Sequence, residues 1–207
     1  MLESSLRSAT FLFIALVTAT CGSATVYEPR NGDIIFHTSR SAQSVAIQKA
    51  TGSPYSHMGI VYLKEGKAHV YEAVEPVKLT PLDSWIERGE GGRFVAKRLE
   101  HADQMLTPGA LNRMLEVGKT FEGKHYDLYF EWSDDRIYCS ELVWKIFKRA
   151  LDIEVGELQT VNEFDLSDPE VQAKLQERWG GPPPSDEIVI SPVAIFNSSK
   201  LFTVYQR

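Results

Sequence analysis

Cys139 is the residue in this sequence whose surroundings best suit a nucleophile. Beyond it, apolar or small residues recur at spacings of three, four, seven, eight and eleven, which is one stripe of an amphipathic helix. Cys139 is therefore predicted in the first turn, where unpaired backbone N–H groups and the helix dipole favour a thiolate. The polar segment 133–135 is expected to mark the helix start. The alternative is that Cys139 is a small hydrophobic residue of the core.

His57 is the histidine that we expect to serve Cys139 as a base. A cysteine nucleophile needs a group that takes its proton and a third group that orients that base. His57 opens the β-rich segment 57–63 directly after a turn at 52–56, so its ring is predicted at a sheet edge, where active sites are often built. An ordinary hydrogen-bonded histidine is the alternative. The sequence suggests no partner for the others, which are His37, His69, His101 and His125.

Glu72 is the expected orienting group. The turn at 64–67 predicts a hairpin, and a register centred on that turn puts His57 opposite about Val74, one pair away from Glu72. A carboxylate among apolar strand neighbours is costly to bury alone, and an imidazole N–H is a suitable partner for it. An exposed glutamate on an edge strand is the alternative.

The elements that position these residues suggest one α+β domain, a small antiparallel sheet with helices packed against it. Strands are expected at 32–36, 57–63, 68–74, 93–99, 188–190 and 201–205, and helices at 41–50, 81–89, 108–119, 139–150 and 169–179. Ser167 is the expected cap of the last helix, with Pro169 in its first turn. The glycine- and proline-rich stretch 180–184 is expected to be an irregular loop.

The first 24 residues differ from the rest of the chain. Arg7 precedes an apolar run of eleven residues, 9–19, and small residues lead up to Ala24. This pattern predicts a secretory signal at 1–24, a single domain at 25–207 and an exported protein in the periplasm or cell envelope. A lipid-modified Cys21 is a weaker alternative. Once Cys21 is removed or acylated, Cys139 is the one thiol left, which favours a reactive cysteine.

The composition argues against several kinds of partner and cofactor. The net charge is −6 without a basic cluster, so nucleic acid is not expected to bind. Zinc on Cys139, His57 and Glu72 is conceivable, but the sequence has no HExxH motif, and the mature chain has no second cysteine. The acidic segment 127–135 lacks the ligand spacing of a known calcium loop. We therefore expect no metal and no cofactor.

Several segments of the chain together resemble the YiiX/YebB-like cysteine hydrolases, which belong to the circularly permuted branch of the papain-like, NlpC-type superfamily. They are GDIIF at 32–36, YSHMG at 55–59, YEAV at 71–74, WSDDR at 132–136, YCSELVW at 138–144 and EFDLS at 163–167. The order of histidine, then glutamate, then cysteine carries the resemblance, because unpermuted papain-like enzymes place the cysteine first. The likeness covers most of the chain after residue 25.

The resemblance implies a permuted papain-like fold, with Cys139 as nucleophile, His57 as base and Glu72 as the orienting residue. It also implies that Tyr126 helps line the oxyanion side; packing in an aromatic connector is the alternative. The backbone N–H of Cys139 is the other expected oxyanion donor. The implied substrates are amides or esters, such as peptidoglycan peptides or lipids. A lipid acyltransferase or thioesterase of the same fold, and a non-catalytic envelope binding domain, are the rival readings.

Overall fold

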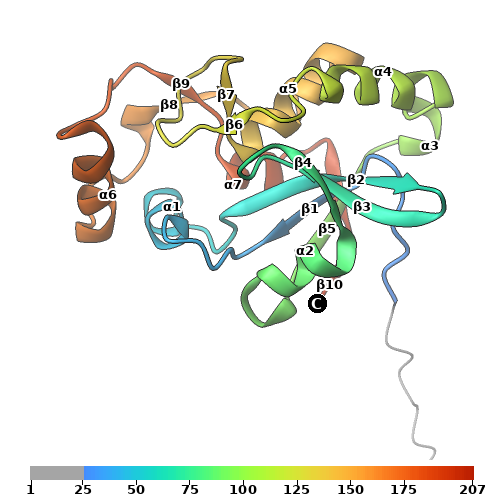
Figure 1. Cartoon of the computed structure of the whole chain (residues 1–207), viewed down its shortest axis with the longest axis horizontal. Coiled ribbons are helices and arrows are strands. Elements are labelled where there is room, and N and C mark those ends of the chain that lie inside the picture. Colours follow the sequence, from blue (N-terminus) through green and yellow to red (C-terminus); the bar gives the residue numbers. More distant parts are fainter. Residues whose placement is uncertain (1–25) are drawn as a thin grey trace, which may run out of the picture.

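A computed structural model describes residues 26–207, and its centre is a six-stranded antiparallel sheet (Figure 1). The strand order is β10-β5-β1-β2-β3-β4. These strands are β1 (Ile34–His37), β2 (His57–Lys64), β3 (Lys67–Glu72), β4 (Lys78–Pro81), β5 (Val95–Leu99) and β10 (Leu201–Gln206). Five of the six expected strands lie in this sheet, whereas the one expected at 188–190 lies outside it and β4 was not expected. The sheet agrees with the fold class that the sequence predicted.

Helices cover both faces of this sheet (Figure 1). They are α1 (Ser44–Thr51), α2 (Leu82–Arg88), α3 (Ala102–Met105), α4 (Pro108–Lys119), α5 (Cys139–Leu151), α6 (Pro169–Trp179) and α7 (Pro192–Phe196), with short 3₁₀ turns η1 (Glu90–Gly92) and η2 (Val161–Glu163). Helix α5 packs against α4 and β2, whereas α1 pairs with α6 at one end of the molecule. No helix within residues 26–207 is long and apolar enough to cross a membrane.

Alternation along the strands divides the core into two layers. Met58 and Ile60 of β2 join the larger cluster, which contains the buried side of α5, while Val61 joins a smaller one beneath Trp85 of α2. Because His57 shares the parity of Val61, its side chain belongs to the α2 layer. His57 is nevertheless the first residue of β2, so its ring lies at the end of the sheet, where the start of α5 can approach it.

The register of the β2–β3 hairpin agrees with the one predicted from the turn. Lys64 pairs with Lys67 and Ile60 with Tyr71, which places Gly59 across from Glu72. A Cβ atom on Gly59 would lie 2.5 Å from Val70 Cγ1 and 2.7 Å from the carbonyl oxygen of Tyr71. The absence of a side chain at Gly59 is thus what allows the backbone of β3 to come this close beside Glu72.

Helix α5 buries the stripe that the sequence predicted. Leu142, Val143, Ile146 and Phe147 are fully buried, and burying side chains of this size contributes about 1.5–3 kcal/mol each. Glu141 and Lys145, one turn apart, are buried too and form an ion pair at 2.6 Å.

The start of α5 differs from the expectation that residues 133–135 mark it. Asp134 instead binds Lys145 and Arg149, which lie well inside the helix. The cap is Tyr138, whose N–H lies 3.4 Å from the Glu141 carboxylate. The prediction was wrong because Asp134 finds cationic partners further along the same helix, which sequence distance does not indicate.

The C-terminal third adds one further correction. Asp168, and not Ser167, caps α6 by accepting a hydrogen bond from the N–H of Glu170. The hydroxyl of Ser167 is instead bound to Asp165. Two short ladders complete the fold, in which β6 (His125–Tyr126) pairs with β7 (Arg136–Ile137) and β8 (Gln159–Thr160) pairs with β9 (Ile188–Val189). The predicted signal at 1–24, with Cys21, lies outside the described residues.

Replacing Gly59 with alanine should destabilise the protein by about 1–3 kcal/mol, because the added methyl group meets the backbone of β3. The free energy of unfolding from urea titration measures this. Gly109→Ala in α4 is the matched control, because its Cβ would meet nothing closer than 3.9 Å. Its free energy of unfolding should be unchanged or higher by up to about 1 kcal/mol. An unchanged urea midpoint for Gly59→Ala would contradict the close approach described here.

Candidate functional site

Cys139 lies at the N-terminus of α5, as the sequence predicted. It is 2% exposed and forms no disulfide within residues 26–207. The two residues beside it anchor the helix start to the segment before α7: the Ser140 hydroxyl donates to the carbonyl of Ile190 at 2.7 Å, and the Tyr138 hydroxyl accepts from the N–H of Ile190 at 3.0 Å. These two bonds hold the position of the sulfur.

His57 and Glu72 form a buried pair. Nε2 of His57 lies 2.6 Å from Oε2 of Glu72, and the two residues are 8% and 0% exposed. Because Nε2 is bound to the carboxylate, Nδ1 is the ring nitrogen left for Cys139. Burial alone would lower the pKa of His57, but its interactions with Cys139 and Glu72 outweigh burial and raise it to about 9. The ring is therefore charged at neutral pH when Cys139 is a thiolate.

Glu72 stays ionised although it is fully buried. Burial raises the pKa of its carboxyl group, but His57, the Thr80 hydroxyl and the charge of Arg88 lower it, and the net change is downward. Oε1 accepts a 2.5 Å hydrogen bond from Thr80 Oγ1 and is also bound by Arg88. Glu72 is thus not the exposed edge-strand glutamate of the alternative reading.

His37 is a neighbour of this pair that sequence reasoning missed. It stands directly across from His57 in the β1–β2 register, with the two ring centroids 5.3 Å apart, and its ring stacks on Trp85 at 3.9 Å. Burial, the charge of His57 and the nearby arginines lower its pKa to about 2. His37 is therefore a neutral ring against which the charged His57 is packed. Only the pairing of β1 with β2, which the sequence did not predict, would have revealed it.

Tyr126 lies close to Cys139. Parallel pairing of β6 with β7 puts Tyr126 opposite Ile137, two residues before Cys139. Its hydroxyl accepts a 2.8 Å hydrogen bond from Gln43, a residue that the sequence did not single out. Burial and the nearby charge of Cys139 raise the pKa of Tyr126 well above its usual value, so the phenol is neutral and its O–H can donate.

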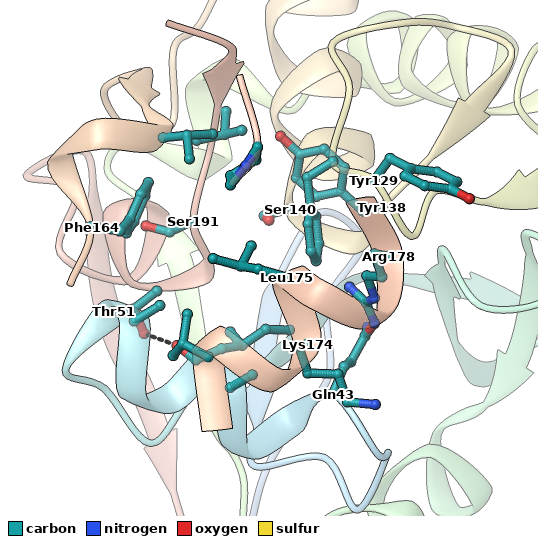
Figure 2. Close-up of a pocket in the computed structure, with 18 of the residues that line it drawn as sticks. Gln43, Thr51, Tyr129, Tyr138, Ser140, Phe164, Lys174, Leu175, Arg178 and Ser191 are labelled. Carbon is teal, nitrogen blue, oxygen red and sulfur yellow. Dashed lines mark hydrogen bonds between the residues drawn. The ribbon is translucent and has the colours of Figure 1, made fainter. Parts of the chain in front are cut away.

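Two cavities meet at this site. An apolar cavity of about 140 Å³ reaches Cys139 and Ser140 between α1, α6 and the segment before α7 (Figure 2). An open cleft of about 820 Å³ reaches His57 and His37. Tyr126 borders both of them. Gln43, Tyr129, Lys174 and Arg178 border both of them as well, so the two cavities share a wall.

Within residues 26–207, no three side chains of histidine, cysteine, aspartate or glutamate are grouped so that they could hold a metal ion. Both oxygens of Glu72 are engaged by protein donors. The acidic segment 127–135 is likewise occupied, since Asp127 accepts from the N–H groups of Tyr129 and Glu131, and Asp134 binds Lys145 and Arg149.

Comparisons with known proteins agree with this fold. Residues 28–205 match the family described as "Permuted papain-like amidase enzyme, YaeF/YiiX, C92 family". The chain is 49% identical over 181 residues to YiiX of Escherichia coli (strain K12), an uncharacterized protein, covering 87% of this chain and 88% of YiiX. It is also similar to the crystal structure of the metalloprotein yiiX from Escherichia coli O157:H7, with a TM-score of 0.83, 49% identity and coverage of 87% of this chain and 99% of that one.

The family match spans nearly all of the described residues and includes the sheet, α5 and both cavities. It agrees with the cysteine hydrolase that the sequence indicated. The chain belongs to the family of permuted papain-like amidases of the YaeF/YiiX type.

Proposed function

We propose that this amidase works through Cys139 as nucleophile, His57 as general base and acid, and Glu72 as the residue that orients His57. The observation that carries the proposal is the buried contact of 2.6 Å between His57 and Glu72, at the place where the first turn of α5 presents the thiol. A base held by a third group beside a thiol is the arrangement that cysteine hydrolases require.

The reaction follows from these positions. Nδ1 of His57 takes the proton of Cys139, and the thiolate attacks the carbonyl carbon of the amide. The C–N bond then breaks as His57 gives its proton to the leaving amine, and a thioester remains on Cys139. A water molecule, deprotonated by His57, attacks the thioester and releases the carboxylic acid. The thiolate of Cys139 that leaves is again stabilised by the positive charge of the His57 imidazolium.

Negative charge forms on the carbonyl oxygen in both steps and needs hydrogen-bond donors. The N–H of Cys139 has no partner within the helix because it lies at the helix N-terminus, where the helix dipole also favours an anion. The hydroxyl of Tyr126 is the second proposed donor, since it is neutral and lies beside Cys139. Its bond from Gln43 leaves its own hydrogen free for this oxygen.

The relative yiiX is called a metalloprotein, but the residues of this site do not fit a metal ion. Glu72 already binds His57, Thr80 and Arg88 through its two oxygens, and Nε2 of His57 faces that carboxylate. Without displacing Arg88 or breaking the His57–Glu72 contact, a cation could bind only the sulfur of Cys139 and Nδ1 of His57, which is fewer protein ligands than a zinc site uses. The proposed mechanism therefore has no step that involves a metal.

Removing the nucleophile should cost more activity than removing the orienting group. Cys139→Ala should abolish amide hydrolysis, whereas Glu72→Gln should retain roughly one part in 10² to 10⁴ of it, because an amide can still hold the ring in place but does not stabilise its charge. Initial rates on an amide substrate measure both. The exposed control Glu116→Gln should keep full activity. Equal loss in Cys139→Ala and Glu72→Gln, with both variants folded, would contradict the orienting role.

The charge state of His57 gives a test that depends on pH. Its pKa is raised in the folded protein, so the charged ring is kept below about pH 9 and is lost as the pH rises through that value. Activity should accordingly fall on the alkaline side of about pH 9. In NMR titrations the His57 midpoint should move down in Cys139→Ala, which lacks the interaction that raises it, with the exposed His101 as internal reference. A His57 midpoint that is unchanged by Cys139→Ala would contradict the pairing of the two residues.

A further inference from the structure

We infer, resting on the proposed function, that Gln43 and Arg178 are positioning residues for the oxyanion: together they direct the hydroxyl hydrogen of Tyr126 toward the carbonyl oxygen of the bound amide. Neither of the two touches the reacting atoms, and both act through Tyr126.

Three side chains from distant parts of the chain form a line of hydrogen bonds. Nη2 of Arg178 in α6 lies 2.7 Å from Oε1 of Gln43, which precedes α1, and Nε2 of Gln43 lies 2.8 Å from the hydroxyl oxygen of Tyr126. Figure 2 shows the side chains of Arg178 and Gln43 directed toward each other. All three residues border both the apolar cavity and the cleft, so the line is part of the wall that the two spaces share.

Arg178 determines which way round the amide of Gln43 lies. A guanidinium presents only N–H donors and has no acceptor, so the amide atom that faces it must be the oxygen. The other end of the amide, its NH₂ group, therefore faces Tyr126 and can only donate. Without Arg178 either end of the amide could face the phenol, because the oxygen and the nitrogen are nearly equal in size.

The amide in turn determines where the hydrogen of Tyr126 lies. Because the phenol oxygen accepts from Gln43, its own hydrogen must point elsewhere, and among residues 26–207 the hydroxyl donates to no acceptor. The raised pKa of Tyr126, caused first by burial and then by the charge of Cys139, keeps this hydrogen on the oxygen. The space left for it is the one that Tyr126 shares with Cys139, where the oxyanion forms.

An amide at position 43 is not the side chain that would bind Arg178 most strongly. A glutamate of the same size would form a charge-assisted bond with the guanidinium, but it would also accept the hydrogen of Tyr126. Glutamine accepts at one end and donates at the other, which is what a line that starts at an arginine and ends at a free phenol hydrogen requires.

Helix α1 does not account for Gln43. The residue occupies the N-cap position of α1, yet its side chain makes no capping hydrogen bond to that helix. Serine, threonine, aspartate and asparagine are the residues that cap well. Arg178 is for its part held in place by the carbonyl of Leu128, to which Nη1 donates at 2.9 Å, and by the ring of Phe130.

Substitutions at position 43 separate the direction of the hydrogen bond from mere contact. Gln43→Glu keeps the size and both contacts but takes the hydrogen of Tyr126, whereas Gln43→Met loses both contacts and leaves that hydrogen free. We expect Gln43→Glu to slow acylation of Cys139 by p-nitrophenyl acetate about 10²-fold, close to the loss in Tyr126→Phe, and Gln43→Met to slow it about tenfold or less. Added to Tyr126→Phe, Gln43→Glu should cost little more, because it acts through the same hydroxyl.

Alkylation by iodoacetamide is the control reaction. The Cys139 thiolate then displaces iodide from a CH₂ carbon, so no oxyanion forms, whereas p-nitrophenyl acetate gives an oxyanion before p-nitrophenolate leaves. The ratio of the acylation rate to the alkylation rate should fall about 10²-fold in Gln43→Glu. Gln176→Glu, which adds the same charge at an exposed position of α6, is the matched control and should keep the ratio of the unmodified protein.

The outcomes distinguish this inference from the proposed hydrolysis. Acylation of Gln43→Glu that is as fast as that of Gln43→Met, or an equal loss in acylation and alkylation, would overturn the positioning role. Full acylation in Tyr126→Phe would also overturn it and would leave the roles of Cys139, His57 and Glu72 standing. Acylation at an unchanged rate in Cys139→Ala would instead refute the proposed hydrolysis.

Discussion

The buried contact between Glu72 and His57 is the interaction on which the rest of this site depends. A carboxylate with no exposure to water is tolerated only when donors surround it, and here they come from three elements: His57 at the start of β2, Thr80 in β4 and Arg88 at the end of α2. These partners fix the imidazole at the end of the sheet. Gly59, opposite Glu72, allows the two strands to come close enough.

The second requirement is that a thiol reaches the free side of that ring. Helix α5 lies on the other face of the sheet. Its first turn lies at the sheet edge because the apolar stripe that follows along the helix is buried against β2 and α4. Ser140 and Tyr138 then fix the helix start to Ile190. The same contact makes one wall of the apolar cavity, so the residues that position the sulfur also shape the space beside it.

The sequence predicted those features of the site that depend on local spacing. The position of Cys139 follows from a helical period that begins at that residue, and the meeting of His57 with Glu72 follows from a short turn, because a turn determines register over a whole hairpin. Contacts between distant segments were not predictable in this way. Arg88 and Thr80 reach Glu72 from elements whose place in the sheet the sequence does not specify. His37 became a neighbour of His57 only through the β1–β2 pairing. Asp134 was wrongly expected to mark the start of α5 for the same reason, since its partners Lys145 and Arg149 lie well inside that helix.

If Cys139 carries the acyl group during amide hydrolysis, the thioester on its sulfur can be trapped and identified. The protein is mixed with p-nitrophenyl acetate, quenched in acid within the first turnover and analysed by intact mass and peptide mapping. We expect the peptide that contains Cys139 to gain the mass of one acetyl group, which hydroxylamine removes, and we expect much slower labelling in His57→Ala. Labelling that persists unchanged in Cys139→Ala, or that maps to another residue, would contradict it.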